Sequence, residues 1–321
     1  MNPLLTAFDL CLAAILIGLT WAVLFSRDDF RAVVLFISLG LVMALAWVRL
    51  SAPEVALAEA AIGAGISGAL LISALPRLRK KNHQTDPAGA EKSRRSRRLA
   101  PAGPGVLGLL GLAALLLLLT SGILLGLTPP FRTGPAPLTT ELMPLSGVRN
   151  QVTAVLLNFR SFDTLLELAV LLLAVMGLWS WGRGGPAGPG GRAPIAAGPV
   201  LLTLIRGILP LAILIAGYLA WIGDRAPGGA FQSGAVLGAA GIMLGLTVRP
   251  LTDFFPSWLL RSVLVVGLVF FLLLAALPLA GGRLFFQYPT TYAGAFILAI
   301  EAAAALAIGL ALSLLPGSRP R

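Results

Sequence analysis

The chain has 321 residues, of which 57% are hydrophobic and 12% charged, and its mean hydropathy is +0.91. This composition excludes an ordinary soluble domain and predicts an integral membrane protein. The formal net charge of +11 does not indicate a nucleic-acid partner, because the basic residues concentrate beside apolar runs and are not interleaved with aromatic residues.

The sequence offers few residues for metal or redox chemistry. The one cysteine, Cys11, lies in an apolar run, and the one histidine, His83, lies in a polar linker. These counts exclude an internal disulfide, a cysteine-based metal cluster and ligation by pairs of imidazoles. The sequence also contains no nucleotide-binding loop or catalytic triad in a suitable context. We therefore expect no cofactor, no metal site and no enzymatic activity of this chain by itself.

Apolar runs long enough to cross a bilayer recur along the chain. The first, LLTAFDLCLAAILIGLTWAVLF, is too long for the apolar region of a signal peptide and has no basic flank before it, so we expect a retained helix. Helices are expected throughout, because lipid cannot satisfy backbone polar groups and the alternation typical of a barrel is absent. The predicted fold class is all-α, a polytopic membrane protein. The nine predicted helices span roughly residues 4–25, 32–49, 54–76, 104–127, 163–182, 199–222, 232–248, 258–280 and 291–316.

The basic residues predict an orientation. The linker PRLRKKNHQTDPAGAEKSRRSRRLAPAGPG, between the third and fourth helices, carries nine Lys or Arg residues and is expected to be cytoplasmic. The N-terminus then lies outside and the C-terminus in the cytoplasm, which places 18 basic residues inside and 6 outside. All six tryptophans fall near predicted helix ends, where an amphipathic ring is favourable.

Two linkers divide the chain into three predicted membrane modules. The first is the basic linker, and the second is the Gly- and Pro-rich segment GRGGPAGPGGRAPIAAG. The predicted boundaries are a three-helix module at 1–76, a linker at 77–103, a two-helix module at 104–182, a linker at 183–198 and a four-helix module at 199–316.

Acidic residues within apolar helices are the main functional candidates, because a carboxylate at a helix centre costs about 2.5–3.5 kcal/mol on insertion scales. Asp9 lies near a helix end, and Glu54 follows Ser51 and Pro53 in a pattern typical of a capping box, so structural roles are favoured for both acids. Glu59 lies five residues further in, beyond the first turn where the helix dipole helps. A functional role is favoured for Glu59.

A second charged group stands at the start of the fifth predicted helix. Arg160, Asp163 and Glu167 share one helix face if the helix begins by Arg160. An interfacial ion pair is favoured for Arg160 and Asp163, with a part in ion movement as the alternative. Glu167 lies deeper in the helix. Partial desolvation raises a carboxyl pKa and a nearby arginine lowers it, so Glu167 is a candidate for proton exchange near neutral pH.

The C-terminal module carries a stripe of glycines and a Gly-rich turn. The stripe consists of Gly234, Gly238, Gly241 and Gly245. This spacing predicts that the backbone of another helix packs closely against it. Just before it, DRAPGGAFQSG places Gly228 and Gly229 in an outer turn, followed by Phe231 as a candidate gate and Gln232 as a candidate polar ligand. A simple tight turn is the alternative explanation for these glycines.

Glu301 is the last intramembrane acid. It lies about ten residues into the ninth predicted helix and has no charged neighbour in the sequence. We expect it either to face a partner helix or to carry a proton.

Three stretches together resemble a known assembly. SAPEVALAEAAIGAG is similar to the signature of the D subunit of membrane-bound hydrogenase, which also occurs in the C-terminal part of the A subunit of Mrp-type multisubunit Na+/H+ antiporters. RNQVTAVLLNFRSFDTLLELAVLL resembles the two-helix E-subunit module that follows it there, and DRAPGGAFQSGAVLGAAG resembles the four-helix B subunit of the same antiporters. Modules of three, two and four helices recover the nine helices counted above.

The resemblance implies a fused subunit of an Mrp-type antiporter in a prokaryotic plasma membrane. In that family, the acids that match Glu59 and Glu167 are implicated in moving protons or cations, with Arg160 and Asp163 as neighbours. The implied partners are other antiporter-type membrane subunits, and the implied ions are Na+ and H+. A membrane-arm subunit of a redox-driven, hydrogenase-type complex is the alternative, and a purely structural scaffold is a third possibility.

The chain also departs from the family pattern. Asp224 stands where a histidine is expected, Ala230 and Ser233 replace glycines, and Glu301 is shifted from the acidic position of the last helix. The long antiporter-like domain that opens the A subunit does not precede the first module here. We therefore expect the chain to dock on antiporter-type subunits rather than to exchange ions alone.

Overall fold

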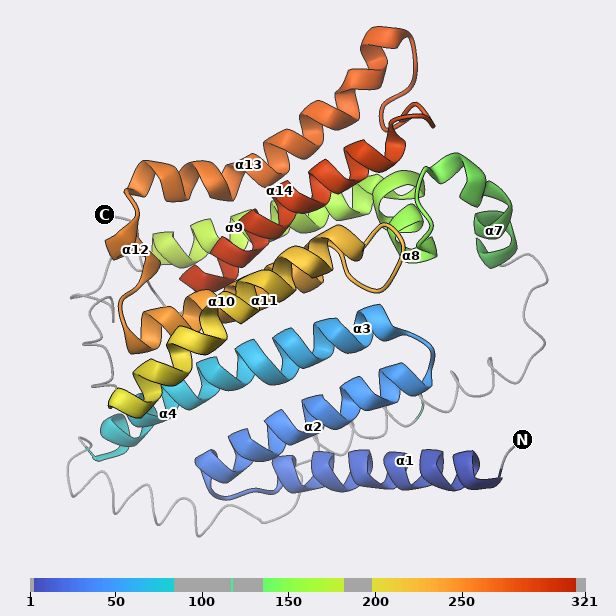
Figure 1. Ribbon diagram of the computed structural model, residues 1–321. Helices are drawn as coiled ribbons and strands as arrows, with labels where there is room; N and C mark the ends of the chain where they lie inside the picture. Colours follow the sequence, from blue (N-terminus) through green and yellow to red (C-terminus); the bar gives the residue numbers. More distant parts are fainter. Residues whose placement is uncertain (1–2, 84–116, 118–134, 182–197, 316–321) are drawn as a thin grey trace. The chain divides into compact units, whose positions relative to one another are not determined.

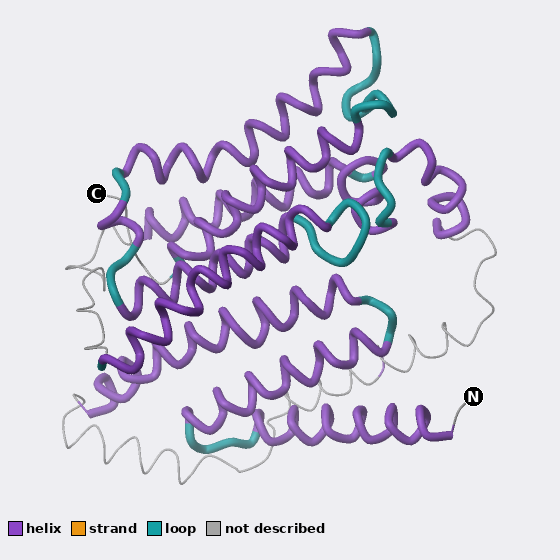
Figure 2. The backbone as a smooth tube through the Cα atoms, in the orientation of Figure 1, coloured by secondary structure: helices purple, strands orange, loops and turns teal. Residues whose placement is uncertain are grey.

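The computed structural model describes residues 3–83, 117, 135–181 and 198–315. Regular structure in these ranges is helical, as Figure 2 shows, and eight helices there are long and apolar enough to cross a membrane. The expected all-α, polytopic membrane fold is confirmed. The predicted helix at 104–127 lies outside the described residues except for residue 117, and the orientation in the membrane stays a prediction.

The helices follow the predicted order (Figure 1). They are α1 Pro3–Leu24, α2 Asp29–Arg49, α3 Pro53–Ala58, η1 Glu59–Ile66, α4 Ser67–His83, α7 Pro135–Ser146, α8 Gln151–Ala154, η2 Val155–Phe159, α9 Ser161–Trp181, α10 Pro199–Ile222, α11 Ala230–Thr247, α12 Leu251–Phe254, α13 Ser257–Ala276, η3 Leu277–Gly281 and α14 Ala293–Leu314. The start of α2 shows the clearest local cause of a difference from prediction. Asp28 caps it by accepting a hydrogen bond from the Arg31 amide at 3.2 Å, so the helix begins before residue 32.

The chain forms two compact units, one of Met1–Ser73 with Leu142–Arg321 and one of Ala74–Glu141. Within the second unit, the structure describes the C-terminal part of α4, residue 117 and the N-terminal part of α7. The core and the polar contacts that position the candidate site belong to the first unit.

One π-helical segment interrupts a membrane-spanning helix, and a second lies just before another. The third predicted helix is built from α3, the π-helix η1 and α4, and η2 joins α8 to α9. A π-turn widens the helix and shifts the backbone hydrogen-bonding pattern, which changes the direction of the side chains that follow. At η2, the Thr164 hydroxyl donates to the Leu156 carbonyl at 2.6 Å and satisfies a backbone acceptor there. Hydropathy does not reveal these segments, because their composition is that of the surrounding helix.

The core of the first unit is centred on α14, the most buried of the eight long helices. Three of the four glycines of the α11 stripe pack against it, whereas Gly245 faces Pro250. A Cβ atom at Gly234 would lie 2.6 Å from Ile308, and one at Gly238 would lie 2.6 Å from Leu312. Gly241 likewise faces Ser313 of α14. Small residues therefore allow the two backbones to approach closely, which is how helices associate without a hydrophobic driving force in lipid.

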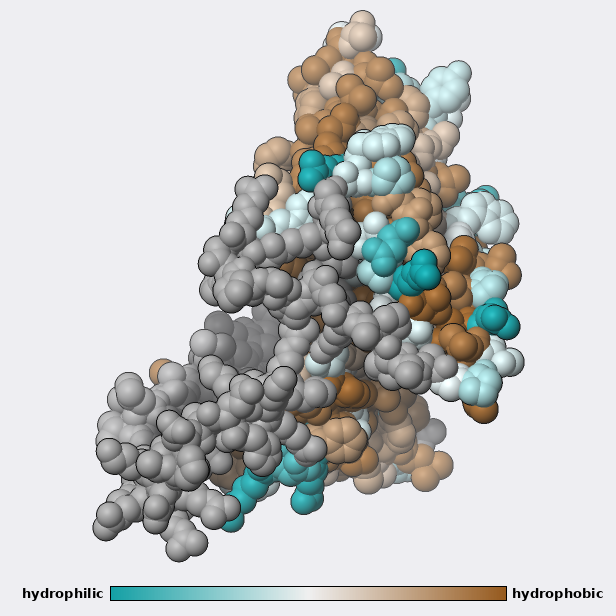
Figure 3. Space-filling model, turned by 90° about the vertical axis from the view of Figure 1, so that its left-hand side faces the viewer, coloured by the Kyte–Doolittle hydropathy of each residue, from teal (hydrophilic) through white to brown (hydrophobic). Residues whose placement is uncertain are grey.

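The periphery is apolar, as expected for a surface that meets lipid or other subunits. Figure 3 shows hydrophobic side chains over much of the described surface on one face, with hydrophilic groups gathered in small areas. α1 is the least buried long helix and packs on α2. Asp9 of α1 accepts two hydrogen bonds from Arg49 of α2, at 2.7 and 2.8 Å. This bidentate pair agrees with the structural role favoured for Asp9.

Candidate functional site

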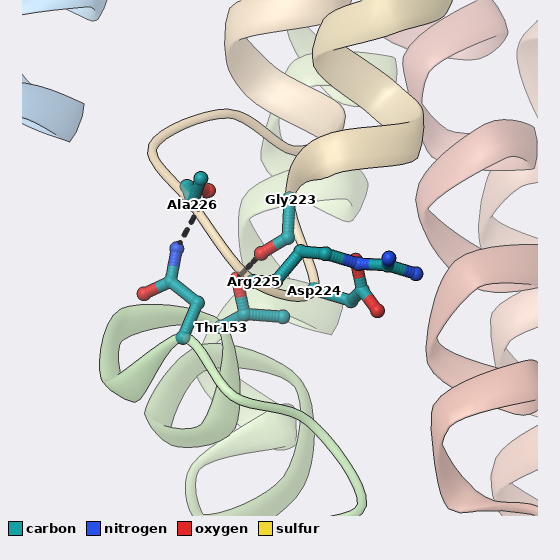
Figure 4. A network of polar contacts seen from close by, with 6 residues as sticks. Thr153, Gly223, Asp224, Arg225 and Ala226 are labelled. Atoms are coloured by element: carbon teal, nitrogen blue, oxygen red, sulfur yellow. Dashed lines mark hydrogen bonds and ion pairs between the residues drawn. The ribbon is translucent and has the colours of Figure 1, made fainter.

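Segments from all three predicted modules meet beside α14 and form a polar junction. The largest is the segment Gly223–Gly229, here called the junction loop, which connects α10 to α11. The amides of Arg149 and Asn150 both donate to the Asp224 carbonyl, at 2.7 and 2.9 Å, and the Thr153 hydroxyl donates to the Gly223 carbonyl at 2.6 Å. Figure 4 shows the Thr153 side chain of α8 hydrogen-bonded to Gly223 of the junction loop. The two-helix and four-helix modules are thus joined by hydrogen bonds.

Asn150 is the residue that holds the junction together. Its side-chain oxygen accepts from the Val152 amide at 2.9 Å and caps α8. Its side-chain nitrogen donates to the Ala226 carbonyl at 2.9 Å and approaches Oε1 of Glu54 at 3.4 Å. Because Asn150 is only 8% exposed, these partners replace water for all of its polar groups. One buried amide therefore contacts all three modules.

Glu54 stands in the first turn of α3, where the positive end of the helix favours it as expected. The predicted capping box is wrong. Ala52 occupies the N-cap without a side-chain hydrogen bond, and Ser51 turns the backbone with a positive φ of 58°. Instead, the Glu54 carbonyl accepts from the Gln232 side chain at 3.2 Å. Glu54 and Gln232 thus connect the first module to the third.

Glu301 lies directly beneath the junction loop. It is the ninth residue of α14 and is 2% exposed. A Cβ atom on Gly229 would lie 2.7 Å from its Oε1, and one on Gly223 would lie 3.0 Å away, so only glycine leaves room for this carboxyl group. Gly229 also has a φ of +104°, which L-residues rarely adopt. The other oxygen, Oε2, is buried without a hydrogen-bond partner within the described residues.

The loop carries its own ion pair at the surface. Nε of Arg225 donates to Oδ1 of Asp224 at 2.9 Å, and its guanidinium lies 5.6 Å from the centre of the Trp221 ring. The hydrogen bond to Asp224 raises the pKa of Arg225. Asp224, which stands where the resemblance led us to expect a histidine, is therefore engaged by an arginine of its own loop.

Glu59 opens the π-helix η1 and is half-buried. Its carboxyl group lies against Gly63, one turn further on, where a Cβ atom would overlap it. The widened turn and the missing side chain at Gly63 give Glu59 space beside its own helix.

The charged group at the start of α9 is arranged differently from expectation. The helix begins at Ser161, and Arg160 lies in the turn that ends η2. Arg160 and Asp163 form the expected ion pair, and both are partly or largely exposed. Glu167 is exposed on the outside of the first unit, next to Leu166 and Val170, which are 48% and 64% exposed.

The structure therefore separates the predicted residues into two groups. Glu54, Gln232, Gly228, Gly229 and Glu301 gather at the junction, whereas the other predicted residues lie elsewhere. Phe231 is half-buried against the main apolar core rather than free at an opening. The roles proposed for all of these residues in ion movement stay predictions.

Sequence reasoning missed Asn150 and Thr153, which are 8% and 5% exposed. Their signal is present in NQVTA, because an asparagine before an apolar helix start is a typical N-cap. The sequence does not reveal their second function, contact with a loop that follows 70 or more residues later.

Two parts of the chain match known families. Residues 14–80 match the family described as the D subunit of MBH, and residues 200–315 match the domain related to the MnhB subunit of the Na+/H+ antiporter. A chain in the solved structure of the Mrp complex from Dietzia sp. DQ12-45-1b is similar in fold, with a TM-score of 0.67 and 22% sequence identity. The similarity covers 97% of this chain but 35% of that one, so this chain spans about a third of its length.

Among curated proteins, none matches the sequence significantly. The matches confirm the resemblance of this chain to the D-subunit module of MBH and to the antiporter MnhB module.

Proposed function

We propose that the chain is a subunit of an Mrp-type multisubunit antiporter that exchanges Na+ for H+ across a prokaryotic plasma membrane. The observation that carries this proposal is that two modules, similar to the D subunit of MBH and to MnhB, meet at a buried polar junction within the first compact unit. Both modules bring a carboxyl group to that junction, from Glu54 and from Glu301.

Glu59 is proposed as a relay for protons or Na+ within the first module. It lies inside a membrane-spanning helix, at the start of a π-turn, and no ion pair or side-chain hydrogen bond engages it within the described residues. π-Turns frequently occur at functional sites, because they expose backbone groups and redirect side chains. A half-buried carboxyl group in such a setting can exchange a proton without first breaking a salt bridge.

Glu167 is proposed to meet a partner subunit. A carboxylate that faces lipid near a helix centre costs about 2.5–3.5 kcal/mol, so the exposed face of α9 is unfavourable in a bilayer by itself. The apolar side chains beside Glu167 make the same face suitable for packing against another membrane helix. An antiporter-type subunit that covers α9 with a polar or basic residue would complete an ion path there.

The test replaces the two acids separately in the assembled complex. Glu59→Gln and Glu167→Gln are expected to abolish Na+/H+ antiport in everted vesicles while leaving complex assembly intact, because glutamine keeps the shape and removes the charge. Asp253→Asn is the matched control, since Asp253 is an exposed acid of the short helix α12. Full antiport by either Gln variant removes that glutamate from the mechanism.

A second candidate function is the membrane arm of a redox-driven, hydrogenase-type complex. The match of residues 14–80 to the D subunit of MBH favours it. The two functions differ in their partners, so purification of the complex decides between them. Copurification of iron–sulfur subunits would favour the redox-driven complex, and copurification of antiporter-type membrane subunits alone would favour the antiporter.

A further inference from the structure

The carboxyl group of Glu301 is buried far from the ends of its helix. Eight residues separate it from the start of α14, which places it about 12 Å along the axis. The junction loop covers it at this depth through Gly223 and Gly229. Non-helical backbone within a membrane protein is stable only where other polar groups satisfy it, and the contacts of Asn150 and Thr153 supply this here. The burial of Glu301 therefore depends on a loop that the neighbouring module holds in place.

The described surroundings of Glu301 supply no counter-charge. The helix packed most closely on α14, α11, carries no titratable residue. The junction loop contributes Asp224, whose negative charge acts on Glu301, and Arg225, which is engaged by Asp224. The titratable side chains on the other helices packed against α14 are exposed or half-buried: Arg206 and Tyr218 on α10, Asp163 and Glu167 on α9, and Arg261 on α13. A charged Glu301 would be buried without a cation within the part of the chain that the structure describes.

A bound proton neutralises the buried Glu301 carboxylate more simply than a metal ion does. An isolated buried carboxylate costs several kcal/mol or more, and the usual outcome is neutralisation by protonation. A bound Na+ would need several further oxygen atoms, and the hydrogen bonds that the loop carbonyls of Gly223, Asp224 and Ala226 accept orient them toward α8 and the residues before it. Gln232 donates through its side-chain nitrogen to the Glu54 carbonyl, and its side-chain oxygen, the atom nearer Gly229, is an acceptor for a proton donor.

We propose that Glu301 is a proton-binding site closed by the junction loop, and that its proton leaves only when this loop moves away from α14. Movement of the loop would break the hydrogen bonds from Asn150 and Thr153, so loss of the proton would be transmitted to α8 and to the two-helix module. This proposal rests on the proposed function only in naming the proton as a transported ion. The closed site itself follows from the contacts of Gly223 and Gly229 with the Glu301 carboxyl group.

The test measures the opening of the loop without measuring transport. Cys11→Ser removes the one native thiol, and Ala226→Cys then places a single reporter in the loop. The rate of alkylation by N-ethylmaleimide is measured in uncoupled membranes that contain the full complex, over a range of pH. When the closed state is favoured, the loop is open in at most about a tenth of the molecules at any time. Full opening is therefore expected to raise the alkylation rate about tenfold. Ionisation of the thiol also raises the alkylation rate as the pH increases. To remove this contribution, the rate at each pH in the chain with Glu301 is divided by the rate of the same reporter in the Glu301→Gln variant.

The ratio is expected to increase about tenfold with pH, because only the chain with Glu301 opens its loop on losing a proton. A ratio that stays constant with pH would overturn the proposal. Protection of the thiol by Na+ at constant alkaline pH, with choline as the control, would also overturn it and assign a cation site instead. These outcomes are independent of antiport, so the proposed function can fail while the proton site survives.

A second measurement does not depend on the Gln variant. Infrared difference spectra of the complex report protonated carboxyl groups, and Glu301→Asp keeps a carboxyl group while changing its surroundings. A band that shifts between wild type and Glu301→Asp would support a protonated Glu301 in the closed state. Identical spectra at a pH where the reporter indicates a closed loop would contradict it.

Discussion

Asp9 and Glu301 are both acids within membrane-spanning helices, but they differ in exposure and in hydrogen-bond partners. Asp9 lies near the end of α1, is partly exposed and accepts hydrogen bonds from Nε and Nη2 of Arg49. Glu301 is fully buried under a glycine-rich loop, and one of its oxygens has no partner among the described atoms. An acid with a matched cation has a structural explanation. A buried acid without a matched cation needs a proton to neutralise it. Asp9 in the first helix is thus stabilised by a cation, and Glu301 in the last helix by a proton.

The largest expected effect comes from filling the space above Glu301. Gly229→Val adds a branched side chain at a φ of +104° and directly against Oε1 of Glu301. Strain and overpacking together are expected to destabilise the first unit by about 3 kcal/mol. The thermal unfolding midpoint of the solubilised complex measures this loss. Gly217→Val, on α10 with open space around it, is the control and should change the midpoint far less; equal midpoints would contradict the tight fit.

A smaller effect is expected from Asn150→Ala. The change removes the cap of α8 and the hydrogen bond to Ala226, and a cap and a buried hydrogen bond together contribute about 2 kcal/mol. Limited proteolysis of the complex should then cut within the junction loop faster than in wild type. Asn158→Ala, which removes one hydrogen bond to the Ser146 carbonyl away from the loop, should leave that cleavage rate unchanged.

Thr153→Val tests one contact of the same junction with little change in shape. It removes the hydroxyl that donates to the Gly223 carbonyl and leaves that acceptor unsatisfied, at a cost of about 1 kcal/mol or slightly more. Hydrogen exchange of the loop amides should become faster, while that of α1 and α2 stays the same. Uniform acceleration across the protein would show that Thr153 acts on global stability rather than on the junction.

The smallest effect is expected at the paired acid. Asp9→Asn leaves Arg49 at a partly exposed site, so the unfolding midpoint should fall only slightly and antiport should continue. The double replacement Asp9→Arg with Arg49→Asp should restore the midpoint, because it keeps an ion pair between α1 and α2. Loss of antiport in Asp9→Asn, with assembly unchanged, would erase the distinction between the paired and the unpaired acid.

The sequence was sufficient for features that depend on local composition. Eight predicted helices appear within a few residues of their expected positions, because length and hydropathy alone determine which segments cross a bilayer. The glycine stripe on α11 was also readable, since its spacing needs no knowledge of the partner helix. The Arg160–Asp163 pair was predictable because its two members are close in sequence.

Features that depend on distant segments were not predictable. The capping box at Glu54 failed because Ser51 is used to turn the chain, and Glu54 instead contacts Asn150 and Gln232. The burial of Glu301 depends on the conformations of Gly223 and Gly229, which no pattern within α14 reports. The π-turns are not visible because a single inserted residue does not change hydropathy.

The partners of Asn150 also constrain biogenesis. When α8 emerges during synthesis, the Ala226 carbonyl that Asn150 needs has not yet been made, since it follows 76 residues later. The asparagine must therefore stay hydrated, or be held by the insertion machinery, until the following hairpin of α10 and α11 arrives. The packing around Asn150 is therefore completed only after residue 226 has been synthesised.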